Sequence, residues 1–146
     1  MDILPLLCGL GNVKLPIDRK IDGKNIISIL QGKEKTTPHD LLYYYNGTSL
    51  QAVREGKWKL HLPRTTKDQP FWHKRKGSGR IFVDLEKPTL FNLNTDIQEK
   101  KNVADQHPNI VSQLLQRATE IRKELGDVRQ QGSDQRKINL ENPQER

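Results

Sequence analysis

The sequence contains a single cysteine, Cys8, so the chain can form no internal disulfide. Aromatic residues make up only 5% and hydrophobic residues only 33% of the chain, whereas an average globular domain has roughly 45–50% apolar residues with glycine included. No apolar run approaches the roughly 20 residues of a membrane-spanning helix. Part of the chain must therefore lie outside a packed core. Cys8 lies in an apolar stretch, which favours a buried, inert thiol over a reactive one.

The first residues also lack the features of an export signal. Asp2 stands where a signal peptide carries positive charge, the apolar stretch is short, and it ends without a small-residue cleavage site. Leu7 is too large for the residue that precedes the cysteine of a lipoprotein signal. We therefore expect no signal peptide. Residues 3–10 are expected to form a short buried helix instead, with Asp2 as its N-cap and Pro5 in its first turn.

The net charge of +7 is concentrated in one stretch. Residues 57–80 hold eight Lys or Arg residues against one acidic residue, Asp68, which gives this stretch alone a net charge of +7. Such a patch is suited to an anionic ligand, and no recognised nucleic-acid-binding module surrounds it. The candidate anion-binding residues are Lys57, Lys59, Lys74, Arg75, Lys76 and Arg80.

Phe71 and Trp72 stand beside these cations, and they leave two interpretations open. Aromatic faces next to Lys and Arg would suit a sulfated or carboxylated polysaccharide. Alternatively, the stretch is a solvated insertion whose two aromatic side chains pack against the rest of the domain. The second interpretation is slightly favoured, because such residues in a small domain usually belong to the core.

Short strands with tight turns are predicted in the middle of the chain. Glycine at positions 47 and 56 marks two turns, because glycine accepts positive φ without strain. Residues 57–62 alternate, with Trp58 and Leu60 on one face and Lys59 and His61 on the other, which is typical of a half-buried strand. The predicted strands are residues 41–45, 50–54 and 57–62, with 81–85 and 90–93 as edge strands.

Three helices are predicted. The strongest covers residues 108–125, where apolar residues recur at three- and four-residue steps and Gly126 ends the pattern. Besides the helix at residues 3–10, a short helix is expected around residues 26–30, capped by Asp22 or Asn25. The sequence therefore predicts an α+β fold: a small antiparallel sheet of about four strands with one C-terminal amphipathic helix packed on it, preceded by two short helices.

Several short motifs occur in a fixed order along the chain. They are Asp2-Ile3-Leu4-Pro5, Leu15-Pro16, residues 18–23, Leu30 with Gly32, His39-Asp40, Tyr43-Tyr44-Tyr45, Gln51-Ala52-Val53-Arg54, Gly56-Lys57-Trp58-Lys59-Leu60-His61, Leu90-Phe91-Asn92-Leu93, Asp96, Glu99, Asn102-Val103-Ala104 and His107-Pro108. No single motif is specific. Together, their order and spacing resemble the C-terminal subdomain of an arylsulfatase-type, formylglycine-dependent sulfatase over about residues 2–127.

The resemblance implies a division of the chain. Residues 1–37 would be the end of a catalytic α/β domain plus a linker, and residues 38–127 would be the C-terminal subdomain. Residues 128–146 are polar and are expected to form a disordered tail, because they offer too few apolar groups to offset the entropy of ordering.

The reaction implied by the resemblance is the hydrolysis of sulfate esters. The family uses a formylglycine nucleophile, made from the first residue of a Cys-x-Pro-x-Arg motif, and a calcium ion that neutralises the sulfate. Cys8 does not fit this motif, because neither Pro nor Arg stands at the required position after it. The acidic residues Asp2, Asp18 and Asp22 are interpreted as surface residues rather than calcium ligands. We expect no catalytic nucleophile and no metal site here, so this chain alone should be inactive.

One residue is a candidate for the substrate side of the intact enzyme. The resemblance implies that His61, at the end of the Gly-Lys-Trp-Lys-Leu-His motif, can contact the sulfate or the leaving group. The alternative is a half-exposed histidine on the polar face of a strand, and the two interpretations are about equally favoured.

Three hypotheses for the function follow. The leading one is a C-terminal fragment of an arylsulfatase-like enzyme whose catalytic domain is encoded in cis or as a separate chain. The second is a free-standing module that binds sulfated or anionic glycans through residues 57–80. The third is a non-catalytic subunit that docks on a separate catalytic chain. The family is typically periplasmic or secreted, but the chain itself gives no indication of location.

Overall fold

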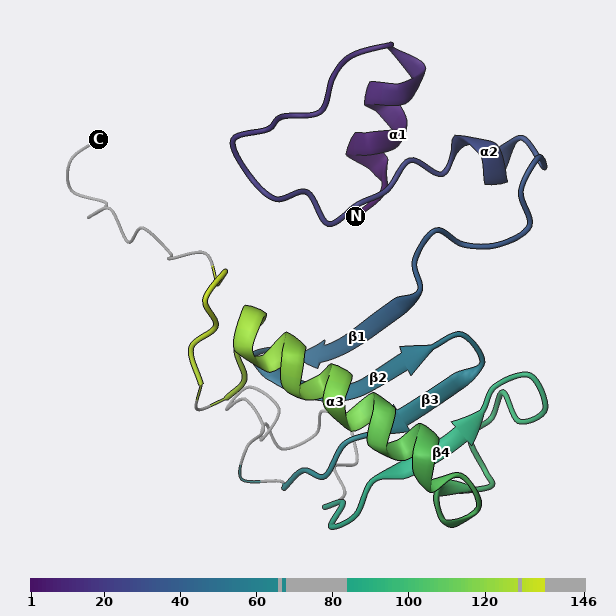
Figure 1. Ribbon diagram of the computed structural model, residues 1–146, viewed down its shortest axis with the longest axis vertical. Helices are drawn as coiled ribbons and strands as arrows, with labels where there is room; N and C mark the ends of the chain where they lie inside the picture. The colour runs from purple at the N-terminus through teal and green to yellow at the C-terminus, as the bar shows by residue number, and fades with distance from the viewer. Residues whose placement is uncertain (66, 68–83, 129, 136–146) are drawn as a thin grey trace, which may run out of the picture. The chain divides into compact units, whose positions relative to one another are not determined.

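The computed structural model describes residues 1–65, 67, 84–128 and 130–135. The chain divides into two compact units, Met1–Asp40 and Leu41–Arg146 (Figure 1). The first unit contains helices α1 and α2, and the second contains a sheet and helix α3. The second unit carries the candidate functional residues.

The second unit is built on a four-stranded antiparallel sheet whose strands lie in chain order, β1-β2-β3-β4. Gly47 and Gly56 occupy the first two hairpin turns with φ angles of 61° and 55°, where a side chain would be strained. A register shift interrupts the pairing of β1 with β2 between Tyr44 and Tyr45. The strands are β1 (Leu41–Asn46), β2 (Ser49–Glu55), β3 (Trp58–His61) and β4 (Thr89–Asn92).

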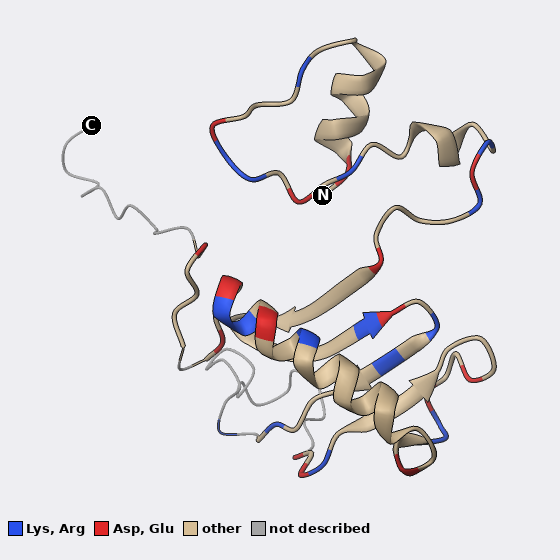
Figure 2. Ribbon diagram, in the orientation of Figure 1, with Lys and Arg blue, Asp and Glu red and all other residues tan. Residues whose placement is uncertain are grey.

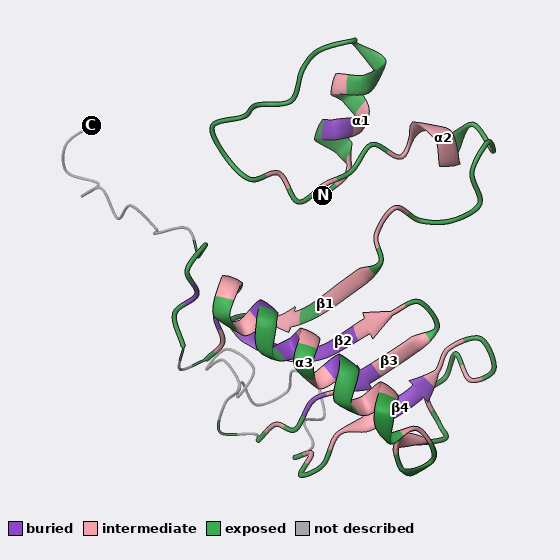
Figure 3. Cartoon of the chain, in the orientation of Figure 1, coloured by how far each residue is buried: buried purple, intermediate pink, exposed green. Residues whose placement is uncertain are grey.

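Helix α3 (Pro108–Leu125) packs across one face of this sheet (Figure 1). Proline at its first position suits the start of a helix, and Gly126 ends it with a φ angle of 88°. Buried residues gather where α3 meets the strands (Figure 3). This core consists of Leu50, Val53, Leu60, Leu62, Leu90, Leu114, Ala118 and Ile121. The predicted α+β fold, with about four strands and a C-terminal amphipathic helix, is confirmed.

The chain beyond α3 is tied back to the sheet. The hydroxyl of Tyr45 donates to the carbonyl of Gly126 at 3.0 Å, and the amide of Leu50 donates to the Asp127 carboxylate at 3.1 Å. The amide of Ser133 then donates to the carbonyl of Lys123. Residues 130–135 therefore fold back on the end of α3, although they were expected to belong to the polar tail; residues 136–146 lie outside the described residues.

The predicted edge strand at residues 81–85 falls largely outside the described residues. Leu85 is described, and it forms an isolated bridge with Arg64 through two backbone hydrogen bonds of 2.9 Å. This bridge fixes the backbone just after β3, where the chain leaves the sheet.

The first unit contains α1 (Ile3–Leu10) and α2 (Ile27–Leu30). Asp2 precedes α1, but its side chain does not cap the helix as predicted. Its carboxylate instead accepts hydrogen bonds from the amide of Lys24 at 3.0 Å and from Nε2 of His39 at 2.8 Å. These contacts join the two ends of the unit, which are 37 residues apart. Neither residue predicted to cap α2 does so, because Ile26 is the N-cap and no side chain caps this helix. Asn25 lies one residue earlier, where its Oδ1 accepts a hydrogen bond from the amide of Ile27 at 3.0 Å.

The prediction that α1 is buried is wrong for most of its side chains. Within this helix Pro5 is buried, whereas Ile3, Leu7 and Leu10 are exposed. The reason is that the first unit contributes too few residues to cover an apolar helix. Cys8 is half-buried.

Candidate functional site

The polar face of β3 carries the residues that were predicted to face a ligand. Because side chains alternate along a strand, Lys59 and His61 lie on the face opposite to Leu60, which enters the core below α3. The pairing with β4 places Phe91 opposite Lys59 and Thr89 opposite His61. Figure 2 shows cationic positions on both β2 and β3, the central strands of the sheet. This face is therefore a mixed surface of cationic, imidazole and aromatic groups.

Glu99 connects the two polar residues of β3. Its Oε1 accepts a hydrogen bond from Nζ of Lys59 at 2.7 Å, and its Oε2 lies 2.5 Å from Nε2 of His61. One carboxylate thus holds two side chains that are two residues apart on the same strand face. We call Lys59, His61 and Glu99 the β3 cluster.

The loop after β4 is folded so that Glu99 can reach the strand. The amide of Asp96 donates to the carbonyl of Asn92 at 2.8 Å, and the amide of Glu99 donates to the carbonyl of Asp96 at 3.1 Å. The carboxylate of Asp96 accepts a further hydrogen bond from the amide of Lys101 at 2.8 Å. Glu99 itself has a φ angle of 54°, which costs a non-glycine residue free energy. The loop therefore holds Glu99 in a strained conformation, and its contacts with Lys59 and His61 offset that strain.

Aromatic rings flank the cluster on two sides. Nζ of Lys59 lies 4.6 Å from the ring centroid of Tyr44, within the range of a cation–π interaction. The ring of His61 meets the ring of Phe91 edge-on, with centroids 5.6 Å apart. The side chains of Lys59, His61 and Glu99 remain 17%, 23% and 25% exposed. A ligand can therefore reach the cluster, whose geometry is fixed from several directions.

The environment shifts the pKa values of His61 and Glu99 in the same direction. Burial lowers the pKa of His61, and the neighbouring Glu99 opposes this effect without cancelling it. Burial raises the pKa of Glu99, but the hydrogen bonds from Lys59 and His61 outweigh burial and leave the pKa below its usual value. At neutral pH the carboxylate is therefore ionised and the imidazole is neutral. Since an ionised carboxylate only accepts hydrogen bonds, Nε2 of His61 carries the proton.

This arrangement suits binding and orientation rather than nucleophilic attack. The neutral His61 ring is fixed in one tautomer, so its Nδ1 is a hydrogen-bond acceptor. The charge of Lys59 is offset by Glu99 at 2.7 Å. The cluster can therefore position a polar ligand, although it offers no activated nucleophile.

The remaining predicted patch residues fall into two groups. Lys57 is exposed, and its Nζ lies 5.3 Å from the ring centroid of Trp58. The other four, Lys74, Arg75, Lys76 and Arg80, lie outside the described residues, as do Phe71 and Trp72. The interpretation of residues 57–80 as an anion-binding patch therefore stays a prediction. Sequence reasoning missed Glu99 as the partner of His61, although Glu99 belongs to one of the ordered motifs.

The described residues do not fit a calcium cage or a formylglycine nucleophile. No group of three or more His, Cys, Asp or Glu side chains converges within the described part of the chain. Cys8 lacks the Pro and Arg of the required motif. Among the described helices, none combines the length and apolar character needed to cross a bilayer.

Comparisons with known proteins agree on one family. Residues 37–144 match the family described as the C-terminal region of aryl-sulfatase. The chain is 31% identical to an N-acetylgalactosamine-6-O-sulfatase of Bacteroides thetaiotaomicron over 78% of its length, and 29% identical to human arylsulfatase D over 91%. A solved structure from work on the metabolism of multiple glycosaminoglycans by Bacteroides thetaiotaomicron matches 82% of the chain, with a TM-score of 0.62 and 29% identity.

The chain spans only 21% and 25% of the lengths of these two relatives, and 24% of the length of the solved chain. The resemblance seen in the ordered motifs is confirmed by these matches, and the chain belongs to the sulfatase family as a C-terminal region of the aryl-sulfatase type.

Proposed function

We propose that this chain is the C-terminal part of an arylsulfatase-like sulfuric ester hydrolase and acts together with a catalytic domain, in cis or as a separate chain. The proposal is supported by the share of each relative that the chain covers, about a quarter or less. In this role the calcium ion and the formylglycine belong to the catalytic domain. The chemistry that they supply is attack on the sulfate ester and neutralisation of its charge.

The structural observation that carries the proposed contact with substrate is the β3 cluster. The carboxylate of Glu99 accepts one hydrogen bond from Nε2–H of His61 and another from the ammonium group of Lys59. This fixes the direction of the imidazole ring, so that His61 can receive a hydrogen bond from the substrate without reorganising. We assign His61 a role in orienting the substrate, and we assign Glu99 the role of positioning His61.

The substrate class is a sulfate ester. A relative at 31% identity is named for a sulfated amino sugar, which supports a sulfated carbohydrate as substrate. The first test concerns the isolated chain, which is expected to release no inorganic sulfate from a chromogenic aryl sulfate. Sustained turnover by purified material would overturn the assignment of catalysis to another domain.

A second test addresses the missing domain and His61 together. The genomic DNA before the coding region should encode a Cys-x-Pro-x-Arg motif, in the same or a shifted frame, or a separate sulfatase chain should co-purify with this one.

In the joined or reconstituted enzyme, His61→Ala should lower kcat/KM by about tenfold or more, because an oriented hydrogen bond to the substrate is lost. The control is Lys123→Ala, at an exposed position of α3 outside the predicted anion-binding stretch, and it should leave kcat/KM within about twofold. Equal losses for both variants would remove His61 from the substrate side.

A further inference from the structure

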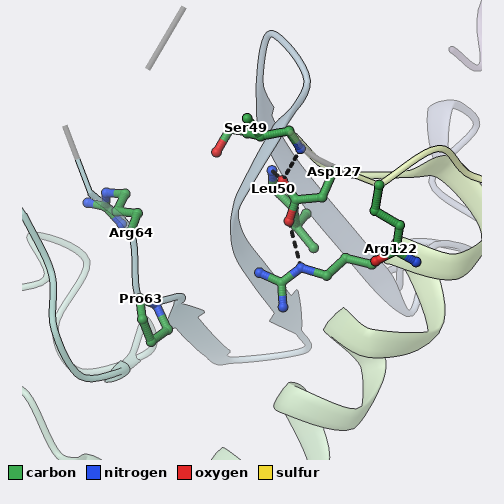
Figure 4. Close-up of a pocket in the computed structure, with 8 residues that line it drawn as sticks. Ser49, Leu50, Pro63, Arg64, Arg122 and Asp127 are labelled. Atoms are coloured by element: carbon green, nitrogen blue, oxygen red, sulfur yellow. Dashed lines mark hydrogen bonds and ion pairs between the residues drawn. The ribbon is translucent and has the colours of Figure 1, made fainter. Parts of the chain in front are cut away.

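A polar cavity on the second unit is lined by residues other than those of the β3 cluster. It has a volume of about 420 Å³. Its walls come from the start of β2, the chain just after β3, the last turn of α3 and the segment that follows α3 (Figure 4). The lining residues are Ser49, Leu50, Pro63, Arg64, Arg122, Asp127, Val128 and Gln130.

Two guanidinium groups reach this pocket from separate segments of the chain (Figure 4). Arg64 follows β3, and its backbone is held by the two hydrogen bonds with Leu85. Its Nη1 lies 3.5 Å from the carbonyl of Leu62, at the outer limit of hydrogen-bond length. Arg122 is in the last turn of α3. Both cations are therefore delivered by segments whose backbones are fixed.

Asp127 orients Arg122 without occupying its whole guanidinium group. Its Oδ2 accepts a hydrogen bond from Nε of Arg122 at 2.6 Å. Its Oδ1 accepts from the backbone amides of Leu50 at 3.1 Å and Val128 at 2.8 Å. Because Asp127 binds Arg122 through Nε, the two terminal nitrogens of Arg122 point away from the carboxylate (Figure 4). Planar terminal nitrogens of this kind match the spacing of two oxygens on one anion.

The charge balance of the pocket also favours an anion. Arg64 and Arg122 contribute two positive charges and Asp127 contributes one negative charge. The carboxylate of Asp127 already accepts three hydrogen bonds, so its charge is largely compensated. A ligand entering the pocket therefore meets one net positive charge.

The rest of the lining indicates what carries the anion. The pocket is larger than a bare sulfate or carboxylate needs, and the exposed side chains of Pro63 and Val128 provide apolar surface for C–H groups. Ser49 and Gln130 provide polar groups that can meet hydroxyls. Apolar wall together with a few placed polar groups is typical of a small-molecule site.

We propose that this pocket binds an anionic sugar unit, whose sulfate or carboxylate is attracted by the charges of Arg64 and Arg122. The inference concerns residues other than His61 and does not depend on catalysis. It also differs from the predicted patch at residues 57–80, because Arg122, Ser49 and Gln130 lie outside that stretch.

The experiment titrates the full chain with a sulfated disaccharide, a uronic-acid disaccharide, the corresponding neutral disaccharide and inorganic sulfate, followed by calorimetry or by amide chemical shifts. We expect saturable binding of at least one anionic sugar, weakening with added salt, and much weaker binding of the neutral sugar and of free sulfate. Comparing the sulfated disaccharide with the uronic-acid disaccharide shows whether the pocket prefers a sulfate or a carboxylate. Neutral sugar binding as tightly as its anionic counterpart, or free sulfate binding as tightly as the sulfated sugar, would overturn the proposal.

The variants Arg64→Gln and Arg122→Gln should each weaken binding by about tenfold or more, because each removes a charge-assisted contact. Lys123→Gln is the matched control: it removes the same charge from the adjacent, exposed position of α3, outside the pocket lining. It should leave the affinity unchanged. If Arg122→Gln fails to fold, Arg64→Gln decides the question, because the side chain of Arg64 makes only a long contact with Leu62 among the described residues. If Arg64→Gln bound the anionic disaccharide with the same affinity as the parent chain, the proposal would be wrong.

Discussion

Nε2 of His61 lies 2.5 Å from Oε2 of Glu99, which comes 38 residues later in the chain. The same carboxylate binds Lys59, so removing Glu99 would release both polar side chains of β3 at once. The orientation of both Lys59 and His61 therefore depends on one residue in a loop.

The first prediction concerns pH. The pKa of His61 in the folded chain lies below the ordinary value of 6.5, chiefly because the ring is partly buried. As the pH falls below that value, the unfolded chain gains a proton at this position while the folded chain does not, so the free energy of unfolding decreases. The lowered pKa of Glu99 acts in the same direction below its ordinary value of 4.5. Urea denaturation should show the chain to be less stable at pH 5 than at pH 7.5.

His61→Gln should flatten this dependence between roughly pH 7 and pH 5, because glutamine does not titrate. The measurement is the slope of the unfolding free energy against pH, compared with that of the parent chain. An unchanged slope in the variant would show that His61 is not the group responsible.

The second prediction concerns Glu99. Glu99→Gln should lower the free energy of unfolding by about 1–2 kcal/mol, because two partly buried, charge-assisted hydrogen bonds are lost. Since Glu99 raises the pKa of His61, the variant should also lower that pKa further. Chemical denaturation measures the first effect, and NMR titration of the ring protons of His61 measures the second.

Glu120 provides the control. It lies on the surface of α3, where its side chain is 50% exposed and pairs with Arg117. Glu120→Gln should cost less than about 0.5 kcal/mol, as exposed ion pairs usually do. A larger loss for Glu120→Gln than for Glu99→Gln would contradict the ranking that burial predicts.

The third prediction concerns the core. Leu114 of α3 is fully buried, with 0% of its surface exposed. Leu114→Ala should destabilise the chain by about 2–5 kcal/mol, since it removes buried methyl groups and leaves a cavity. Leu125→Ala, at a position of the same helix that is 40% exposed, should cost less than about 1 kcal/mol. Thermal or urea denaturation of the two variants tests whether α3 covers the sheet as described.

The fourth prediction concerns the tie at the end of α3. The hydroxyl of Tyr45 donates to the carbonyl of Gly126 at 3.0 Å in a half-buried position. Tyr45→Phe should therefore cost about 1 kcal/mol, the usual contribution of such a hydrogen bond. It should also speed hydrogen exchange at the amides of Gly126 and Asp127. Protection factors equal to those of the parent chain would show that other contacts hold this segment.

Local patterns predicted the elements of the fold well. Alternation at Trp58 and Leu60 identified β3, and the three- and four-residue spacing around Leu114 identified α3, because both patterns arise within a few residues of chain. The turns at Gly47 and Gly56 followed from the need for positive φ. Ordered motifs then identified the family.

Contacts between distant residues could not be predicted in this way. Asp2 is a residue type that often caps helices, yet its carboxylate binds the amide of Lys24 and the ring of His39 instead. Glu99 reaches β3 because it lies in a loop where its own φ angle is positive. The spacing of apolar residues in the sequence does not predict the conformation of such a loop. The anionic-sugar pocket likewise joins Arg64 to Arg122, which are close only after the chain has folded.

The sheet forms between neighbours in the chain, whereas its covering helix begins only at Pro108. During synthesis, β1 to β4 leave the ribosome before α3, so Leu60 and Leu90 have no helix above them at that stage. A chain that ends before Pro108 would leave the apolar face of the sheet exposed to water. Chaperones and proteases would be expected to bind such a chain. The helix that is translated after all four strands is therefore the one that closes this domain.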